Sequence, residues 1–199
     1  TGREVSARQL ANMALSLGDQ GCENVNFVTP SHVAHAVAEA VLLARGGGLT
    51  VPVVYNCGGY DAPETLQRLN GLVEIYMPDF KYADADAGRL FSGVDDYPEV
   101  ARQALHEMYR QVGPLQVNEA GVATGGLLVR HLVMPKDVAR SREAIETVAR
   151  IAPGCAINVM GQYHPAYRSG EFAQLSGTIA GATVSELQDY AASLGLVRA

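Results

Sequence analysis

The sequence contains few cysteines, and they lie far apart in the chain. Cys22, Cys57 and Cys155 are odd in number and fit neither a disulfide framework nor a short metal-binding motif. This pattern is typical of a reducing compartment, so we expect a cytoplasmic protein. The first residues, TGREVSARQL, show neither an export pattern nor an initiator Met, and we expect that a preceding segment is missing.

Long apolar runs and basic stretches are lacking as well. The longest apolar candidate, residues 33–44, carries His35 and Glu39 and is shorter than the roughly 18 residues that a membrane span needs. The net charge of -6 comes without a basic stripe, which argues against a nucleic-acid partner. The signatures of dinucleotide binding, P-loops, zincin proteases and α/β-hydrolases do not occur. We therefore expect neither a membrane nor a nucleic acid as partner.

The chain does contain a regular alternation of short apolar runs and helical patterns. Its 199 residues, 48% hydrophobic and 18% charged, are typical of one globular domain spanning residues 1–199. Strands are predicted at 24–29, 51–56, 72–79, 127–134 and 156–162. Helices are predicted at 6–17, 31–46, 63–69, 97–112, 138–151 and 183–194. Ser31 and Thr183 are expected to cap the second and the last of these helices.

Strands this apolar, alternating with helices, predict a parallel sheet with right-handed crossovers. The architecture is then either a (βα) barrel or an open doubly wound sheet. Two segments depart from the pattern. Residues 83–96 are acidic and indicate a surface loop with a short helical turn, and residues 114–126 indicate a small hairpin that turns near 119–121.

Polar residues end or follow four of the five predicted strands, and in the fourth strand they lie inside it. Ligands of parallel α/β folds bind at the carboxyl ends of the strands, so we expect these residues to line one site. They are Thr29–His32, Asn56–Gly59, Asp79–Tyr82, Arg130–His131 and Gln162–His164.

Charged residues at these ends invite two interpretations. Strand alternation places Asp79 and Lys81 on one face, where they form either part of a ligand site or a structural ion pair. Arg130 lies among apolar neighbours and should meet a carboxylate, either from a ligand or from Asp79. His131 is expected in the core, and Gly58-Gly59 either approaches a ligand closely or simply turns the chain.

Six blocks of the sequence carry a resemblance to a known family. They are GREVSARQLA, NVNFVTPSHV, YNCGGY, VEIYMPDFKY, GLLVRHLVMP and NVMGQYHPAY, and together they cover nearly the whole chain. In this order the chain resembles the radical S-adenosylmethionine superfamily, in the branch that is similar to pyruvate formate-lyase activating enzymes. The resemblance implies an incomplete (βα)6 barrel of parallel strands with outer helices, which binds S-adenosylmethionine across the strand ends.

The resemblance also shows what this chain lacks. In that superfamily a CxxxCxxC loop after the first strand holds a [4Fe-4S] cluster, whose open iron chelates S-adenosylmethionine. This sequence has no such loop, and its three cysteines are spaced too widely to replace it. We therefore expect no metal ligands in this chain, which would be a truncated, cluster-free form of the enzyme.

Residues that match the family's motifs are implied to bind the cofactor. Asp79 and Lys81 match an Asp-x-Lys motif, and Arg130 matches an inward-facing arginine. Ser31, Asn56 and His164 stand at further binding positions. Ser31 lies in a TPSH block where many relatives carry Gly-Gly-Glu-Pro, Asn56 stands in place of an acidic residue, and His164 matches a histidine near the adenosine.

By the resemblance, the complete enzyme would generate a 5'-deoxyadenosyl radical that abstracts hydrogen from a substrate. Implied partners are a protein substrate like a glycyl radical enzyme and an electron donor such as flavodoxin. Two other functions stay open: an aldolase-like barrel with a Schiff base on Lys81, and a non-catalytic module that binds an adenosyl compound. We also expect self-association through residues 24–29, as an exposed edge strand.

Overall fold

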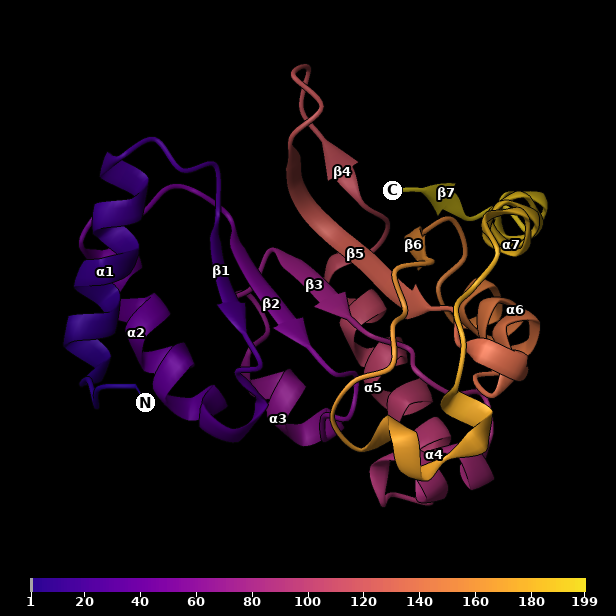
Figure 1. Ribbon diagram of the computed structural model, residues 1–199. Coiled ribbons are helices and arrows are strands. Elements are labelled where there is room, and N and C mark those ends of the chain that lie inside the picture. The colour runs from indigo at the N-terminus through magenta and orange to yellow at the C-terminus, as the bar shows by residue number, and fades with distance from the viewer. Residues whose placement is uncertain (1) are drawn as a thin grey trace.

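The computed structural model describes residues 2–199 as helices packed around one mainly parallel sheet (Figure 1). The strands are β1 Val25–Val28, β2 Val53–Cys57, β3 Ile75–Pro78, β4 Gln116–Val117, β5 Ala123–Leu132, β6 Ala156–Met160 and β7 Val197–Arg198. The helices are α1 Ala7–Asp19, α2 Ala34–Gly46, α3 Pro63–Arg68, α4 Ala85–Ser92, α5 Tyr97–Val112, α6 Ser141–Ile151 and α7 Gly181–Ser193. Short 3-10 turns occur at Ser31–Val33, Pro135–Asp137, Tyr167–Glu171 and Ala173–Leu175.

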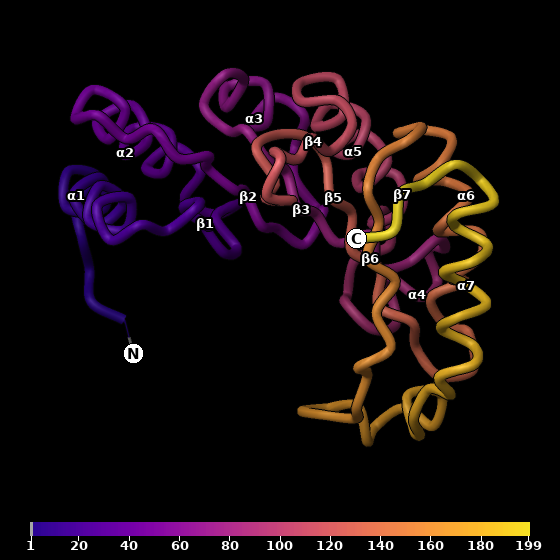
Figure 2. Tube along the Cα trace, turned by 90° about the horizontal axis from the view of Figure 1, so that it is seen from above, coloured from indigo at the N-terminus to yellow at the C-terminus, as the bar shows by residue number. Residues whose placement is uncertain are grey.

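The sheet keeps the order of the strands along the chain. Its path is β1-β2-β3-β5-β6-β7, with every neighbour pair parallel, and β4 pairs antiparallel with β5 off this path. Seen from above, the strands follow a curve, and α2, α3, α5, α6 and α7 lie along its outer side (Figure 2). The predicted α/β class, with parallel strands and outer helices, is thereby confirmed. The two-residue strand β7 was missed because so short a run has no detectable period.

Burial alternates along the strands and distinguishes the two faces of the sheet. In β5, Leu127, Val129 and His131 are buried, whereas Leu128 and Arg130 are only partly buried. The first set faces the helices and the second faces the inner side of the curve, which the helices leave open. A functional site can therefore form on this inner face.

Three local predictions need correction or refinement. Residues 83–96 are not a loop with one turn, because Asp84 accepts bonds from the Asp86 and Ala87 backbone N–H groups and so caps the eight-residue helix α4. Ser31 and Thr183 cap no helix: α2 begins at Ala34 after a 3-10 turn, and α7 begins at Gly181. The predicted hairpin is confirmed as β4 and β5.

None of the helices within residues 2–199 combines the length and the apolar character that crossing a membrane requires.

Candidate functional site

Asp79 is the centre of a charged cluster on the inner face. Its Oδ2 accepts a hydrogen bond from Lys81 Nζ at 2.6 Å, and its Oδ1 accepts one from Arg130 Nε at 2.8 Å. Arg130 Nη2 also donates to Asn56 Oδ1 at 2.8 Å. The shared face of Asp79 and Lys81, and the carboxylate expected beside Arg130, are both present. We call these four residues the charged cluster.

The sheet register explains why residues so distant in sequence meet. Asp79 bridges directly to Arg130 across the neighbouring strands, and Asn56 pairs with Met77, two residues before Asp79. Paired residues of a parallel sheet project from the same face, so these side chains converge at the carboxyl ends of β2, β3 and β5. The cluster is partly open to solvent, since the side chain of Asp79 is 20% exposed and that of Lys81 is 41% exposed.

Tyr97, at the start of α5, holds the backbone beneath the cluster. Its hydroxyl accepts from the Lys81 N–H at 2.9 Å and lies 3.0 and 3.1 Å from the Gly58 and Asp79 carbonyl oxygens, to which it can donate. Burial raises the pKa of Tyr97 above its ordinary value, so the hydroxyl keeps its proton. The sequence alone does not point to Tyr97, because a tyrosine in the first turn of a helix carries no signal for such a contact.

His131 is a core residue, as predicted. Its Nδ1 lies 2.7 Å from the Phe80 carbonyl oxygen, which can only accept, so Nδ1 carries the hydrogen. Nε2 then accepts from Ser141 Oγ at 3.0 Å. The ring thus ties β5 to α6 and to the chain between Asp79 and Lys81. Burial lowers the pKa of His131, which favours this neutral form.

A small cavity opens beside the charged cluster. Its volume is about 290 Å³, and one wall carries Asp79, Lys81 and Arg130. The remaining lining is mostly apolar and consists of Tyr82, Leu132, Met134, Met160 and Gln162. With one carboxylate between two cations, the cluster carries a net charge of +1. The cavity therefore suits a ligand with an anionic end and an apolar body.

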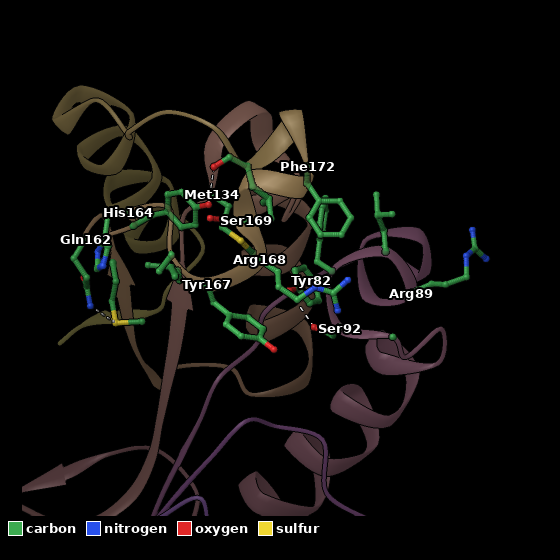
Figure 3. A pocket seen from close by; sticks show the side chains of 18 residues that line it. Tyr82, Arg89, Ser92, Met134, Gln162, His164, Tyr167, Arg168, Ser169 and Phe172 are labelled. Carbon is green, nitrogen blue, oxygen red and sulfur yellow. Dashed lines mark hydrogen bonds between the residues drawn. The ribbon is translucent and has the colours of Figure 1, made fainter.

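A larger cavity of about 810 Å³ adjoins the first one (Figure 3). It shares the five mostly apolar residues with the small cavity and extends between α4 and residues 162–175. His164 lines this larger cavity and not the one with the charged cluster. The reason is that His164 lies four residues beyond β6, where the chain has already left the sheet.

Ser31 lies apart from both cavities, so the expectation that all six residues share one cavity is wrong. It lines a third cavity, of about 180 Å³, together with His35, Thr65 and Leu69. Thr29 has a φ of 54°, which turns the backbone directly after β1. The following 3-10 turn then places Ser31 against α2 and α3 rather than on the inner face.

The described cysteines do not form a metal site. Cys57 and Cys155 are buried and Cys22 is partly buried, and burial raises the pKa of Cys155 to about 12. Within residues 2–199, no group of three His, Cys, Asp or Glu side chains is placed to hold a metal ion. These residues therefore do not fit a [4Fe-4S] cluster.

The fold and the cluster together define a parallel α/β protein with a charged site at its strand ends. No family model matches the chain. It is 26% identical over 155 residues to an uncharacterized protein of Methanocaldococcus jannaschii, which covers 77% of this chain and 41% of that protein. The chain thus spans about two fifths of the length of this curated relative.

Proposed function

We propose that this protein belongs with the radical S-adenosylmethionine proteins that resemble pyruvate formate-lyase activating enzymes, and that it binds S-adenosylmethionine beside the charged cluster. In this proposal the curved sheet is an incomplete (βα)6 barrel, and its inner face carries the ligand. The observation that supports it most is the convergence of Asp79, Lys81 and Arg130 on one cavity at the carboxyl ends of the strands.

The cavity is chemically suited to this ligand. The net positive charge of the cluster favours the carboxylate of the ligand, and Asp79 is the acceptor for its cationic groups. The Lys81 ammonium donates one of its three N–H groups to Asp79, and the others are available to the carboxylate. Asn56 and Asp79 hold the Arg130 guanidinium in place, so its orientation is set before the ligand arrives. The thioethers of Met134 and Met160 offer an apolar surface for the adenosyl group, and His164 lies beyond them in the adjoining cavity.

The proposal for this chain covers binding and orientation of the ligand. Because residues 2–199 hold no ligand set for a [4Fe-4S] cluster, we derive no reaction step that passes through one. Radical formation, hydrogen abstraction from a protein substrate, and an electron donor such as flavodoxin belong to the proposal for a complete enzyme that carries a CxxxCxxC segment.

Isothermal titration calorimetry with S-adenosylmethionine tests the proposal. We expect one saturable site per chain, and we expect Lys81→Met to weaken binding by about tenfold or more, since a hydrogen bond to a charged group contributes about 1.5–3 kcal/mol. Arg102→Met is the matched control, because Arg102 forms an ion pair with Glu99 on α5, away from the cavity. Absence of binding, or equal losses in the two variants, would refute the proposal.

A Schiff-base enzyme is the second candidate, because the Lys81 side chain is 41% exposed and lines a cavity. Incubation with pyruvate and borohydride, followed by mass spectrometry, would then add the reduced adduct to Lys81. We expect no adduct at Lys81 beyond the level found at exposed Lys136. An adduct specific to Lys81 would favour the aldolase-like function instead.

A further inference from the structure

The larger cavity has room that a ligand at the charged cluster does not use. At about 810 Å³ it lies within the range of roughly 300–1,000 Å³ that is typical of small-molecule sites. Figure 3 shows lining side chains from Tyr82 and α4 on one side and from residues 162–175 on the other, with Met134 also in the lining and Arg89 pointing away. We call the part of the larger cavity between these segments the aromatic cavity, because aromatic side chains dominate its lining.

Aromatic and sulfur-containing side chains dominate this lining. Three of the nine tyrosines and two of the four phenylalanines of the sequence lie here, together with two methionines. They are Tyr82, Phe91, Tyr163, Tyr167, Phe172, Met134 and Met160. Aromatic faces and thioether sulfurs interact favourably with a further aromatic ring, beyond what burial of apolar area alone contributes.

Contacts between the two segments hold the rings in position. Phe91 of α4 meets Phe172 edge to face, with ring centroids 5.4 Å apart and an interplanar angle of 81°. The Tyr163 hydroxyl donates to the Leu175 carbonyl oxygen at 2.7 Å, which fastens both ends of the segment after β6. The walls are therefore arranged before any ligand arrives, which reduces the entropic cost of binding.

Tyr167 at the edge of the cavity is unusual on two counts. Its φ of 52° lies in the left-handed region, which costs a bulky residue about 1–2 kcal/mol. Its side chain is nevertheless 98% exposed, so burial within the chain does not offset this cost. A strained and exposed ring beside a cavity is consistent with a residue that contacts a ligand.

The charges at the edge of the cavity are already neutralised. Arg168 donates two bonds to the Glu171 carboxylate, at 2.7 and 2.8 Å, and Arg89 pairs with Asp86. The aromatic cavity thus differs from the charged cluster, which keeps one net positive charge. This difference favours an uncharged ligand.

We infer that the aromatic cavity binds a second small molecule, one that carries an uncharged aromatic ring. The inference that the aromatic cavity is a separate binding site does not depend on the proposed function. The role of the aromatic cavity as a substrate site does rest on the proposed function. Met134 and Met160 line both cavities and would place the aromatic ring of the second ligand next to the adenosyl group.

A fluorescence experiment tests the binding site without S-adenosylmethionine. The sequence has no tryptophan, so Tyr167→Trp gives a single reporter at the edge of the cavity. Titration with the neutral probe N-phenyl-1-naphthylamine should quench this tryptophan by energy transfer, saturating at one probe per chain. Leu90→Asp, at a lining residue that is 48% exposed, should weaken probe binding by tenfold or more.

Leu42→Asp is the matched control, because Leu42 is 59% exposed on α2, away from the cavity. It should leave probe binding unchanged. Displacement then tests the ligand class: p-cresol should displace the probe at about fivefold lower concentration than 4-methylcyclohexanol, since aromatic pairing adds about 0.5–1.5 kcal/mol. The inference would be overturned if probe binding did not saturate, or if Leu90→Asp and Leu42→Asp weakened it equally. It would also be overturned if p-cresol and 4-methylcyclohexanol displaced the probe at equal concentrations.

The two proposals fail in different ways. Leu90→Asp should leave S-adenosylmethionine binding unchanged, because Leu90 does not line the small cavity. If the Tyr167→Trp protein with Leu90 intact fails to bind the probe but still binds S-adenosylmethionine, the aromatic site alone is rejected. Probe binding without S-adenosylmethionine binding would reject the proposed function alone. Displacement of the probe by saturating S-adenosylmethionine would reject the separate second site.

Discussion

Gly59 sets the spacing between the loop after β2 and the chain at Asp79. Its φ is 77°, and an added Cβ would overlap the Asp79 carbonyl oxygen and lie 3.4 Å from the Tyr97 hydroxyl. The approach of Gly58-Gly59 to a ligand stays a prediction, whereas Gly59 closely approaches the backbone of the protein itself. That contact helps to place Asp79 within the charged cluster.

Substitution of Gly59 should accordingly be costly. We expect Gly59→Ala to lower the free energy of unfolding by about 3 kcal/mol, through backbone overlap added to the strain of a positive φ. Gly71 is the matched control, because its φ is 78° and an added Cβ would have no neighbour within 4 Å. Gly71→Ala should cost about 1 kcal/mol. Urea denaturation measures both, and equal losses would show that the overlap relaxes freely.

His131 should make stability depend on pH in a defined window. Its pKa is lowered in the folded protein, so below its ordinary value of about 6.5 the unfolded chain binds a proton that the folded chain refuses. The contribution of the neutral His131 ring to stability is complete above about pH 6.5. It is lost as the pH falls toward the pKa of His131 in the folded protein. The loss amounts to at most about 1.4 kcal/mol per pH unit.

Urea denaturation at pH 7 and pH 5.5 measures this effect. His131→Gln should reduce the difference in unfolding free energy between the two pH values, whereas His106→Gln, at an exposed position on α5, should preserve it. An unchanged difference in the His131 variant would mean that other groups cause the pH dependence.

At the scale of elements, β1 is the first strand of the sheet, and within the described residues 2–199 it pairs with β2 alone. Val28 at its end is 67% exposed. An unpaired strand edge with an exposed β-branched residue is a template for pairing with another chain. The structure thus has the edge from which self-association was expected, and that association stays a prediction.

Sedimentation velocity over a range of concentrations tests the edge strand. We expect the native chain to associate and Val28→Lys to shift it toward monomer, because a charge on the edge opposes strand pairing. Leu42→Lys, with a similar exposure on α2, should leave association unchanged. A native chain that stays monomeric at high concentration would contradict the prediction.

At the scale of the whole molecule, one hydrophobic core connects the two ends of the sheet. It runs without a break from Ala11 of α1 to Leu187 and Ala191 of α7. The β7 strand near the C-terminus also pairs with β6 and continues the same sheet. Such continuity favours unfolding of the described chain as one cooperative unit.

Cooperative unfolding can be measured with two signals that report on different features. Circular dichroism follows the helices, and tyrosine fluorescence follows residues such as Tyr55 and Tyr76 in the core. We expect both to change at the same urea concentration in a single transition. Separated transitions would show that the chain contains more than one folding unit, contrary to the single domain predicted for residues 1–199.

The sequence by itself determined the order of the elements and the nature of the strand ends. Strand alternation has a period of two, so Asp79 and Lys81 share a face if the backbone stays extended past Pro78. An arginine within an apolar strand must find a carboxylate. These are local requirements of the backbone and of desolvation. They predicted the Asp79–Lys81 pair and the environment of Arg130 correctly.

Only the tertiary structure decided which of the remaining residues meet. The turn at Thr29 removed Ser31 from the inner face, the chain beyond β6 carried His164 into the neighbouring cavity, and the packing of α5 brought Tyr97 beneath Asp79. The aromatic cavity likewise joins α4 to residues 162–175. Contacts of this kind depend on sheet curvature and on where loops are fastened, and neither produces a periodic signal in the sequence.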